Sequence, residues 1–194
     1  RMVIIAVLAA VAFPFIVAIL SGQSPAAVLS GEAGNAKFLQ GLLIEVFILG
    51  LYALSYDLVL GITGLLSFGH AMFFAVGAYA AGILLKSFGW PLWATVLGVL
   101  VAAVLQAVLF GLVVPRVKGL AFALVTLGIA YVFFVVVQSS DVAQYTGADV
   151  GLQGVPVPDW IDTNVHRFRM YLLCLAVLAA AFILYRAIVS SPTG

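Results

Sequence analysis

A nearly continuous apolar block runs from Phe38 to Leu85 and reads FLQGLLIEVFILGLYALSYDLVLGITGLLSFGHAMFFAVGAYAAGILL. A helix needs about 20 apolar residues to cross roughly 30 Å of hydrocarbon, so this block is too long for one span and suits two. Gly61-Ile-Thr-Gly64 is the only plausible turn inside it, and that turn carries no Lys or Arg to mark a water-exposed loop. We therefore expect the join to lie within protein at membrane depth, as a broken helix or a re-entrant segment near residues 61–70.

The composition of the chain indicates that its natural solvent is lipid. Hydrophobic residues make up 65% of the 194 residues and charged residues 8%, whereas a soluble domain carries about 25% charged residues. The formal net charge of +1 gives no reason to expect nucleic acid as a partner. The single cysteine, Cys174, lies in an apolar run, so neither a disulfide framework nor a cysteine metal cluster is expected.

The same length criterion predicts about six transmembrane helices in an all-α, polytopic integral membrane bundle. The predicted spans are residues 2–20, 38–60, 66–85, 91–114, 120–138 and 170–188. The first of them is longer than the roughly 7–15 apolar residues of a signal peptide, so a retained span is expected. The longest polar stretch, residues 139–169, contains four Asp, two Pro and Trp160 and is expected to be an ordered loop outside the membrane.

The positive charges alone do not fix the orientation. If both ends lie on one side, the two sides carry four cations each: Arg1, Arg116, Lys118 and Arg186 on that side, and Lys37, Lys86, Arg167 and Arg169 opposite. The pair at 116 and 118 lies in a very short loop, where the positive-inside rule has most force. We therefore expect a cytoplasmic N-terminus and an extracytoplasmic loop at residues 139–169.

Two carboxylates lie inside the second predicted span. Glu45 and Asp57 are twelve residues apart, about 18 Å along a helix, so they cannot form a catalytic pair. A carboxylate at the bilayer centre costs about 2.5–3.5 kcal/mol on insertion scales, so it usually faces protein or a water-filled cavity. Each residue could line a translocation pathway or orient a broken helix; the alternative is a structural carboxylate that caps a helix or pairs with an Arg.

The join between the second and third spans carries further candidates. Gly61, Gly64 and Gly69 permit sharp turns and close backbone approach. Ser67 is expected to cap the next helix, whose free N–H groups and positive dipole end could meet an anionic group. His70 would lie in the first turn of that helix, where it either lines the pathway or serves as a structural hydrogen-bonding group. Discontinuous helices meet a substrate carboxylate in this way in several transporters.

Motifs of soluble enzymes are absent from the sequence. It holds no glycine loop followed by Lys for phosphate, no paired His and Glu at metal spacing and no nucleophile elbow. We therefore predict no catalytic residue, no metal site and no cofactor. If the transport is driven by ATP, another subunit must supply that step.

Residues 61–79, GITGLLSFGHAMFFAVGAY, resemble the signature of branched-chain amino acid ABC transporter permeases of the LivM type. The usual form is Gly-x-x-Gly-leucine-Ser-leucine/Phe-Gly-His-Ala-x-Phe-x-x-x-Gly-Ala-Tyr. Residues 116–127 are similar to the family's pattern of basic residues, Gly, aromatic-Ala and Thr-Leu, which adds Thr126 to the candidates for the pathway. Residues 146–156 are similar to its Thr-Gly-Gly…Gly-Leu…Gly-Ile-Pro loop. Ala148 replaces the second Gly of that loop, and Ala121 stands where an aromatic residue is usual.

The resemblance implies the N-terminal part of one transmembrane permease domain in the cell membrane of a prokaryote. Such a permease moves branched-chain amino acids into the cell with a homologous permease subunit, two ATPase subunits and an extracytoplasmic substrate-binding protein. Ser191-Pro-Thr-Gly194 is similar to the Ser-x-x-Gly that leads into the family's coupling loop, so the 194-residue piece is not expected to couple ATP hydrolysis to transport. Two alternatives stay open: a urea or short-chain amide permease of the same family, and a proton-coupled secondary transporter with Glu45, Asp57 and His70 as a relay.

Overall fold

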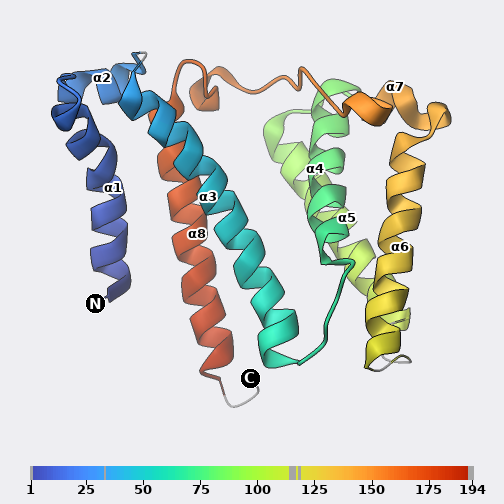
Figure 1. The fold of residues 1–194 in the computed structure, drawn as a ribbon. Coiled ribbons are helices and arrows are strands. Elements are labelled where there is room, and N and C mark those ends of the chain that lie inside the picture. Colours follow the sequence, from blue (N-terminus) through green and yellow to red (C-terminus); the bar gives the residue numbers. More distant parts are fainter. Residues whose placement is uncertain (1, 33, 114–116, 118, 192–194) are drawn as a thin grey trace. The chain divides into compact units, whose positions relative to one another are not determined.

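The computed structural model describes residues 2–32, 34–113, 117 and 119–191. Every regular element in these residues is a helix, and the helices form two units (Figure 1). Unit 1, residues 1–58 and 157–194, holds α1 (Met2–Leu20), α2 (Pro25–Ser30), α3 (Asn35–Asp57), the 3-10 helix η5 (Asp159–Ile161) and α8 (Arg167–Val189). Unit 2, residues 59–156, holds most of the π-helical turn η1 (Leu58–Ile62), then α4 (His70–Lys86), α5 (Leu92–Val113), α6 (Leu120–Gln138), η3 (Ser140–Val142), α7 (Ala143–Thr146) and η4 (Ala148–Val150).

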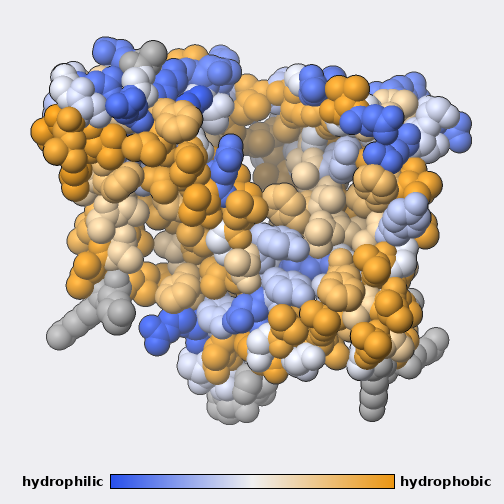
Figure 2. All heavy atoms as spheres, viewed as in Figure 1, coloured by the Kyte–Doolittle hydropathy of each residue, from blue (hydrophilic) through white to orange (hydrophobic). Residues whose placement is uncertain are grey.

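The helices have the composition and exposure of a membrane bundle. Four helical stretches are long and apolar enough to cross a bilayer: Asn35–Ile62, Leu92–Leu112, Leu120–Gln138 and Arg167–Val189. Large apolar side chains such as Leu109 and Leu184 are 64% and 62% exposed, which is unfavourable in water and ordinary in lipid. In Figure 2 hydrophobic residues cover most of the helical stretches, and hydrophilic ones gather over α2, around α7 and in the lower centre of the view. The expected all-α, polytopic membrane fold is therefore confirmed.

The predicted spans and the observed helices agree in order and differ at their ends. The fifth span has the bounds of α6, and the sixth begins at Arg167 rather than Met170. Two apolar stretches, Ile5–Leu20 and His70–Lys86, are shorter than the others. The 17 residues of α4 rise about 26 Å, against roughly 30 Å of hydrocarbon. The predicted span end at Val114, the cations at 1, 116 and 118, and residues 192–194 lie outside the described residues.

In unit 1, α3 and α8 run side by side in the same direction. At their first turns the Arg167 guanidinium donates to the Lys37 carbonyl at 3.0 Å, and the Lys37 ammonium donates to the Asn164 carbonyl at 3.0 Å. At their far ends the Tyr185 hydroxyl donates to the Asp57 carboxylate. The core between the helices is formed by Ile44, Phe47, Tyr171, Cys174 and Leu175. The hydrogen bonds at the first turns and the one at the far ends hold the two helices in register.

A proline inside α1 creates the tie between α1 and α8. Pro14 is fully buried in the helix, and it has no N–H to donate to the carbonyl of Ala10, four residues earlier. The Tyr171 hydroxyl of α8 donates to that carbonyl at 2.7 Å. Lipid cannot donate a hydrogen bond to a free carbonyl. The carbonyl that the proline leaves without a donor therefore needs one from a second helix.

Tyr171→Phe is expected to lower the stability of the permease, because the Ala10 carbonyl then loses its donor. Interhelical hydrogen bonds in membranes contribute about 0.6–1.7 kcal/mol, so we expect a loss of about 1 kcal/mol. The measurement is the thermal midpoint of the protein purified in detergent. Tyr131→Phe is the matched control, since Tyr131 is 65% exposed on α6. Equal midpoints for the two variants would show that the Tyr171 hydroxyl contributes nothing.

In unit 2, α4 packs antiparallel to α5 and parallel to α6. The pairs that meet along α5 are Phe73 with Phe110, whose ring centroids are 4.6 Å apart, and Leu84 with Gly98. The pairs that meet along α6 are Gly69, just before α4, with Thr126, and Tyr79 with Phe133. These directions are the ones required of three consecutive helices that cross a bilayer back and forth.

The segment that follows α6 is tied to the ends of both neighbouring helices. The buried Thr146 hydroxyl donates to the Val137 carbonyl of α6 at 2.7 Å and accepts from the Ala148 N–H at 3.3 Å. The Lys86 ammonium at the end of α4 donates to the Gln153 carbonyl. These bonds, together with η3, α7 and η4, give this part of the predicted loop a defined structure.

Ala148→Gly is expected to raise the stability by about 0.5–1 kcal/mol. Ala148 has a φ of +47°, in the left-handed region that costs an L-residue roughly 1–2 kcal/mol. Glycine removes this strain and gives back about 0.4–1 kcal/mol by loosening the unfolded chain. The thermal midpoint of the purified protein measures the net change in stability. Ala78→Gly, at an exposed position of α4, is the control and should lose about 1 kcal/mol of stability. A lower thermal midpoint for Ala148→Gly as well would show that Ala148 is not strained.

Candidate functional site

The break between η1 and α4 holds most of the candidate pathway residues. The π-helical turn η1 ends at Ile62 and α4 begins at His70, with residues 63–69 outside any regular helix. Gly61 lies inside η1, and π-helical turns are frequent at functional sites. Gly64 has a φ of +69°, which favours glycine. The chain thus has a discontinuity between two apolar helices at the position that the sequence indicated.

Ser67 does not cap α4, so that prediction was wrong. Gly69 is the N-cap residue, and no side-chain hydrogen bond caps the helix there. A capping side chain must lie at the N-cap itself to reach the N–H groups two or three residues further on. Ser67 comes two residues too early for this, and it is buried, with 6% of its surface exposed.

Gly69 and Thr126 come together in the structure. A Cβ built on Gly69 would lie 2.4 Å from the backbone oxygen of Thr126, so only glycine allows this approach. Thr126 is 1% exposed, and its hydroxyl donates to the Ala123 carbonyl of its own helix at 2.9 Å. The contact therefore joins the start of α4 to the middle of α6 through backbone atoms.

A pocket of about 310 Å³ surrounds the break, and we call it the break pocket. Its polar side chains are Thr63 and Ser67 from the break and His70 from the first turn of α4. The half-buried His70 ring lies 6.0 Å from the ring of Phe73, centroid to centroid. The remaining walls are Val59, Leu65, Phe110, Gly111 and Phe122. Apolar walls with a few convergent polar groups at a helix start are the usual composition of a small-ligand site.

Glu45 and Asp57 lie on α3 in unit 1 and do not line the break pocket. Glu45 is exposed on its helix. Asp57 accepts the hydrogen bond from Tyr185, so its partner is a tyrosine hydroxyl rather than an arginine. This contact supports the structural interpretation of Asp57.

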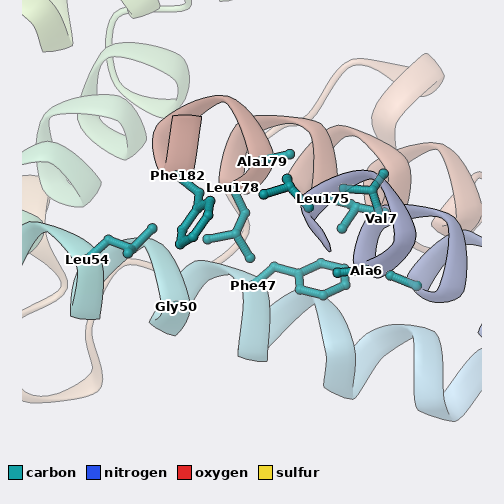
Figure 3. Close-up of a pocket in the computed structure, with 11 residues that line it drawn as sticks. Ala6, Val7, Phe47, Gly50, Leu54, Leu175, Leu178, Ala179 and Phe182 are labelled. Atoms are coloured by element: carbon teal, nitrogen blue, oxygen red, sulfur yellow. The ribbon is translucent and has the colours of Figure 1, made fainter. Parts of the chain in front are cut away.

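Unit 1 has a groove of about 580 Å³ between α1, α3 and α8 (Figure 3). Its labelled walls include Val7 of α1, Phe47 and Leu54 of α3, and Leu178 and Phe182 of α8. No residue that lines it carries a charge or a polar side chain, within the described part of the chain. The groove therefore offers nothing to bind an ammonium or a carboxylate, and the break pocket is the better candidate for a polar solute.

The aromatic walls of the break pocket were missed in the sequence. Residues 87–91 form the short connection between α4 and α5, which makes these helices an antiparallel hairpin. In this hairpin Phe73 of α4 meets Phe110 of α5. Phe110 lies five residues further from the turn than Phe73 does, so counting equal distances from the turn does not find the pair. Thr63 was also missed, although it lies between the two glycines of the predicted turn.

The chain is similar in sequence to known transport permeases. The sequence model of the family described as "Branched-chain amino acid transport system / permease component" matches residues 38–194. The high-affinity branched-chain amino acid transport system permease protein LivM of Escherichia coli K12 is 29% identical over 116 residues, which is 59% of this chain and 26% of that protein. LivM of Salmonella typhimurium LT2 is 30% identical over 115 residues, with the same two shares. The aligned region thus spans about a quarter of the length of these relatives.

No solved structure matches the chain. The family match covers the break, the break pocket and all eight candidate pathway residues. Because it extends over well more than half of the sequence, the chain belongs to the permease-component family of branched-chain amino acid transport systems.

Proposed function

We propose that the chain forms part of the permease subunit of an ATP-binding-cassette importer that moves branched-chain amino acids into a prokaryotic cell. The observation that carries the proposal is the break pocket, where Ser67 and His70 of the matched family region converge with Thr63. Polar groups inside an apolar bundle are costly unless they serve a solute or one another. A pocket at a helix break is also where several transporters bind their substrates.

The partners follow from the same proposal. The permease pairs with a homologous permease subunit, two ATPase subunits supply the energy, and an extracytoplasmic protein delivers the substrate. The support is the family membership together with the lack of any phosphate-binding glycine loop in the sequence. The N-terminus would be cytoplasmic and residues 139–169 extracytoplasmic.

The test is uptake of radiolabelled leucine by proteoliposomes that hold the full-length permease with its partner subunits. We expect uptake that requires ATP and the loaded binding protein. Titration of the binding protein with leucine and with urea distinguishes the two substrate classes, and tight binding of urea alone would contradict the proposed substrate. Uptake that survives without ATP and collapses with an uncoupler would show a proton-coupled transporter instead.

His70→Ala is expected to lower the uptake rate about tenfold, since one lost polar contact of about 1.4 kcal/mol corresponds to that factor. Alanine removes the polarity of His70 from the break pocket without adding bulk. His70→Gln keeps a hydrogen-bonding group that cannot carry a proton at neutral pH, so it should keep most of the rate. Equal loss in both variants would indicate a proton carrier, and no loss in either would remove His70 from the pathway.

A further inference from the structure

Unit 2 has a second pocket, of about 410 Å³, between α4, α6 and the turn η4. We call it the loop pocket, because η4 belongs to the segment after α6. Ala71, Ala75 and Tyr79 line it from α4, and Phe133 and Gln138 line it from α6. Asp149 of η4 lines it at the loop. Thirteen residues of one unit surround this space, so its shape does not depend on unit 1.

Small side chains on α4 keep the loop pocket open. Ala71 and Ala75 are four residues apart on one face, a spacing that usually lets a second helix approach closely. Here the neighbouring helix is α6, and Tyr79 meets Phe133 at a ring distance of 6.3 Å. This aromatic pair lines the pocket together with the two alanines, whose short side chains leave space next to α4.

The two ends of the loop pocket differ in polarity. Because α4 and α6 run in the same direction, Ala71 lies at one end, and Gln138, the last residue of α6, lies at the other. Asp149 joins Gln138 at this second end and is exposed. Asp149 is the only charged residue among those that line the pocket in the described part of the chain. A carboxylate and an amide thus lie at one end of the pocket, and mostly alanine, valine and aromatic side chains line the rest.

This arrangement matches a zwitterion with an aliphatic side chain. The Asp149 carboxylate can bind the ammonium group, and the Gln138 amide and Tyr79 hydroxyl can donate to the carboxylate. The side chain would lie against Ala75 and Phe133. A neutral solute such as urea has no ammonium group to pair with the acid. The charge of the lining therefore favours an amino acid over an amide.

The loop pocket and the break pocket share the first turn of α4. Ala71 and Met72 of α4 line the loop pocket, whereas His70 and Phe73 line the break pocket. The first turn of one helix thus separates the two spaces. We propose that the loop pocket is the entry site of the pathway and that it binds the α-amino group of an aliphatic amino acid through Asp149. This proposal rests on the proposed function.

The role of the Asp149 carboxylate is tested by leucine uptake. The assay uses the full-length permease with its partner subunits and a saturating concentration of the loaded binding protein. We expect Asp149→Asn to lower the uptake rate at least several-fold. Asp141→Asn is the matched control, because Asp141 is an exposed carboxylate of the same segment that does not line the pocket. Wild-type uptake by Asp149→Asn would overturn the inference and leave the proposed function intact. Lack of uptake by the wild type would overturn both.

Chemical modification tests the space in a protein that has already been shown to fold. Ala75→Cys and Ala78→Cys are prepared with Cys174→Ser, and both must transport leucine before treatment. A thiol-reactive ethylammonium reagent is then added. The reagent should block uptake by the Ala75→Cys variant, because residue 75 lines the loop pocket. It should not change uptake by the Ala78→Cys variant, because residue 78 is exposed on the same helix and does not line the pocket. Unchanged uptake by modified Ala75→Cys, with labelling confirmed by mass, would overturn the inference.

Discussion

Gly69→Ala is expected to destabilise the permease by about 3 kcal/mol, at the upper end of the usual cost of overpacking, and to abolish leucine uptake. The added Cβ would lie 2.4 Å from the backbone oxygen of Thr126 and 3.0 Å from its carbonyl carbon. A flexible side chain could move aside, but these atoms belong to the backbone of α6. Relief of the clash requires the start of α4 to move away from α6, which would deform the break pocket. The measurements are the thermal midpoint and the uptake rate.

Gly128→Ala is the matched control for this variant. Gly128 lies on α6 two residues after Thr126, and a Cβ there would meet nothing within 4 Å in the described part of the chain. Alanine favours a helix over glycine by about 1 kcal/mol, so the control should be neutral or more stable. If Gly69→Ala kept the midpoint and uptake of this control, the contact would not be a constraint on the fold.

Gly64 and Gly69 are needed for different reasons. The motif gave these glycines two possible roles together, sharp turns and close backbone approach. A Cβ on Gly64 would meet nothing within 4 Å among the described residues, and the requirement for glycine there is the φ of +69°. A sequence pattern shows that glycine is present, but it cannot distinguish a crowded glycine from one in a left-handed conformation.

The order of the apolar helices and the break between α3 and α4 could be predicted, because both follow from local composition. The start of α4 could not, since it depends on the contact between Gly69 and Thr126, residues 57 positions apart. Without that contact, Ser67 was the best local candidate for a cap. The same limit applies to Tyr171, whose partner is the Ala10 carbonyl freed by Pro14. Local rules identify the free carbonyl, but they do not say which helix supplies the donor.

The candidate site was predictable in part for the same reason. His70 and Ser67 lie in one short motif, and both line the break pocket. Glu45 and Asp57 were chosen because carboxylates are rare in apolar spans, a criterion that does not depend on position in the fold. The structure places both in unit 1 and gives Asp57 a tyrosine partner. Rarity identifies a residue that needs an explanation, and its neighbours in the fold then favour one explanation over another.

Gly147→Ala is expected to have a larger effect than any other substitution in the segment after α6. Gly147 has a φ of +78°, and a Cβ there would lie 2.1 Å from the backbone oxygen of Gly151. The left-handed conformation costs alanine roughly 1–2 kcal/mol, and the clash with backbone adds about 1–3 kcal/mol. We therefore expect a total loss of about 3 kcal/mol or more, read from the thermal midpoint.

Gly154→Ala separates these two costs. Gly154 has a φ of +64°, but a Cβ there would meet nothing within 4 Å in the described residues. The control should lose only the conformational part, about 1–2 kcal/mol. The extra loss in Gly147→Ala then measures the closure of η4 against the residues that follow it. Since η4 carries Asp149, opening this turn should also remove the carboxylate from the loop pocket and slow uptake. Equal midpoints and equal uptake for the two variants would mean that the tight turn neither stabilises the segment nor positions Asp149.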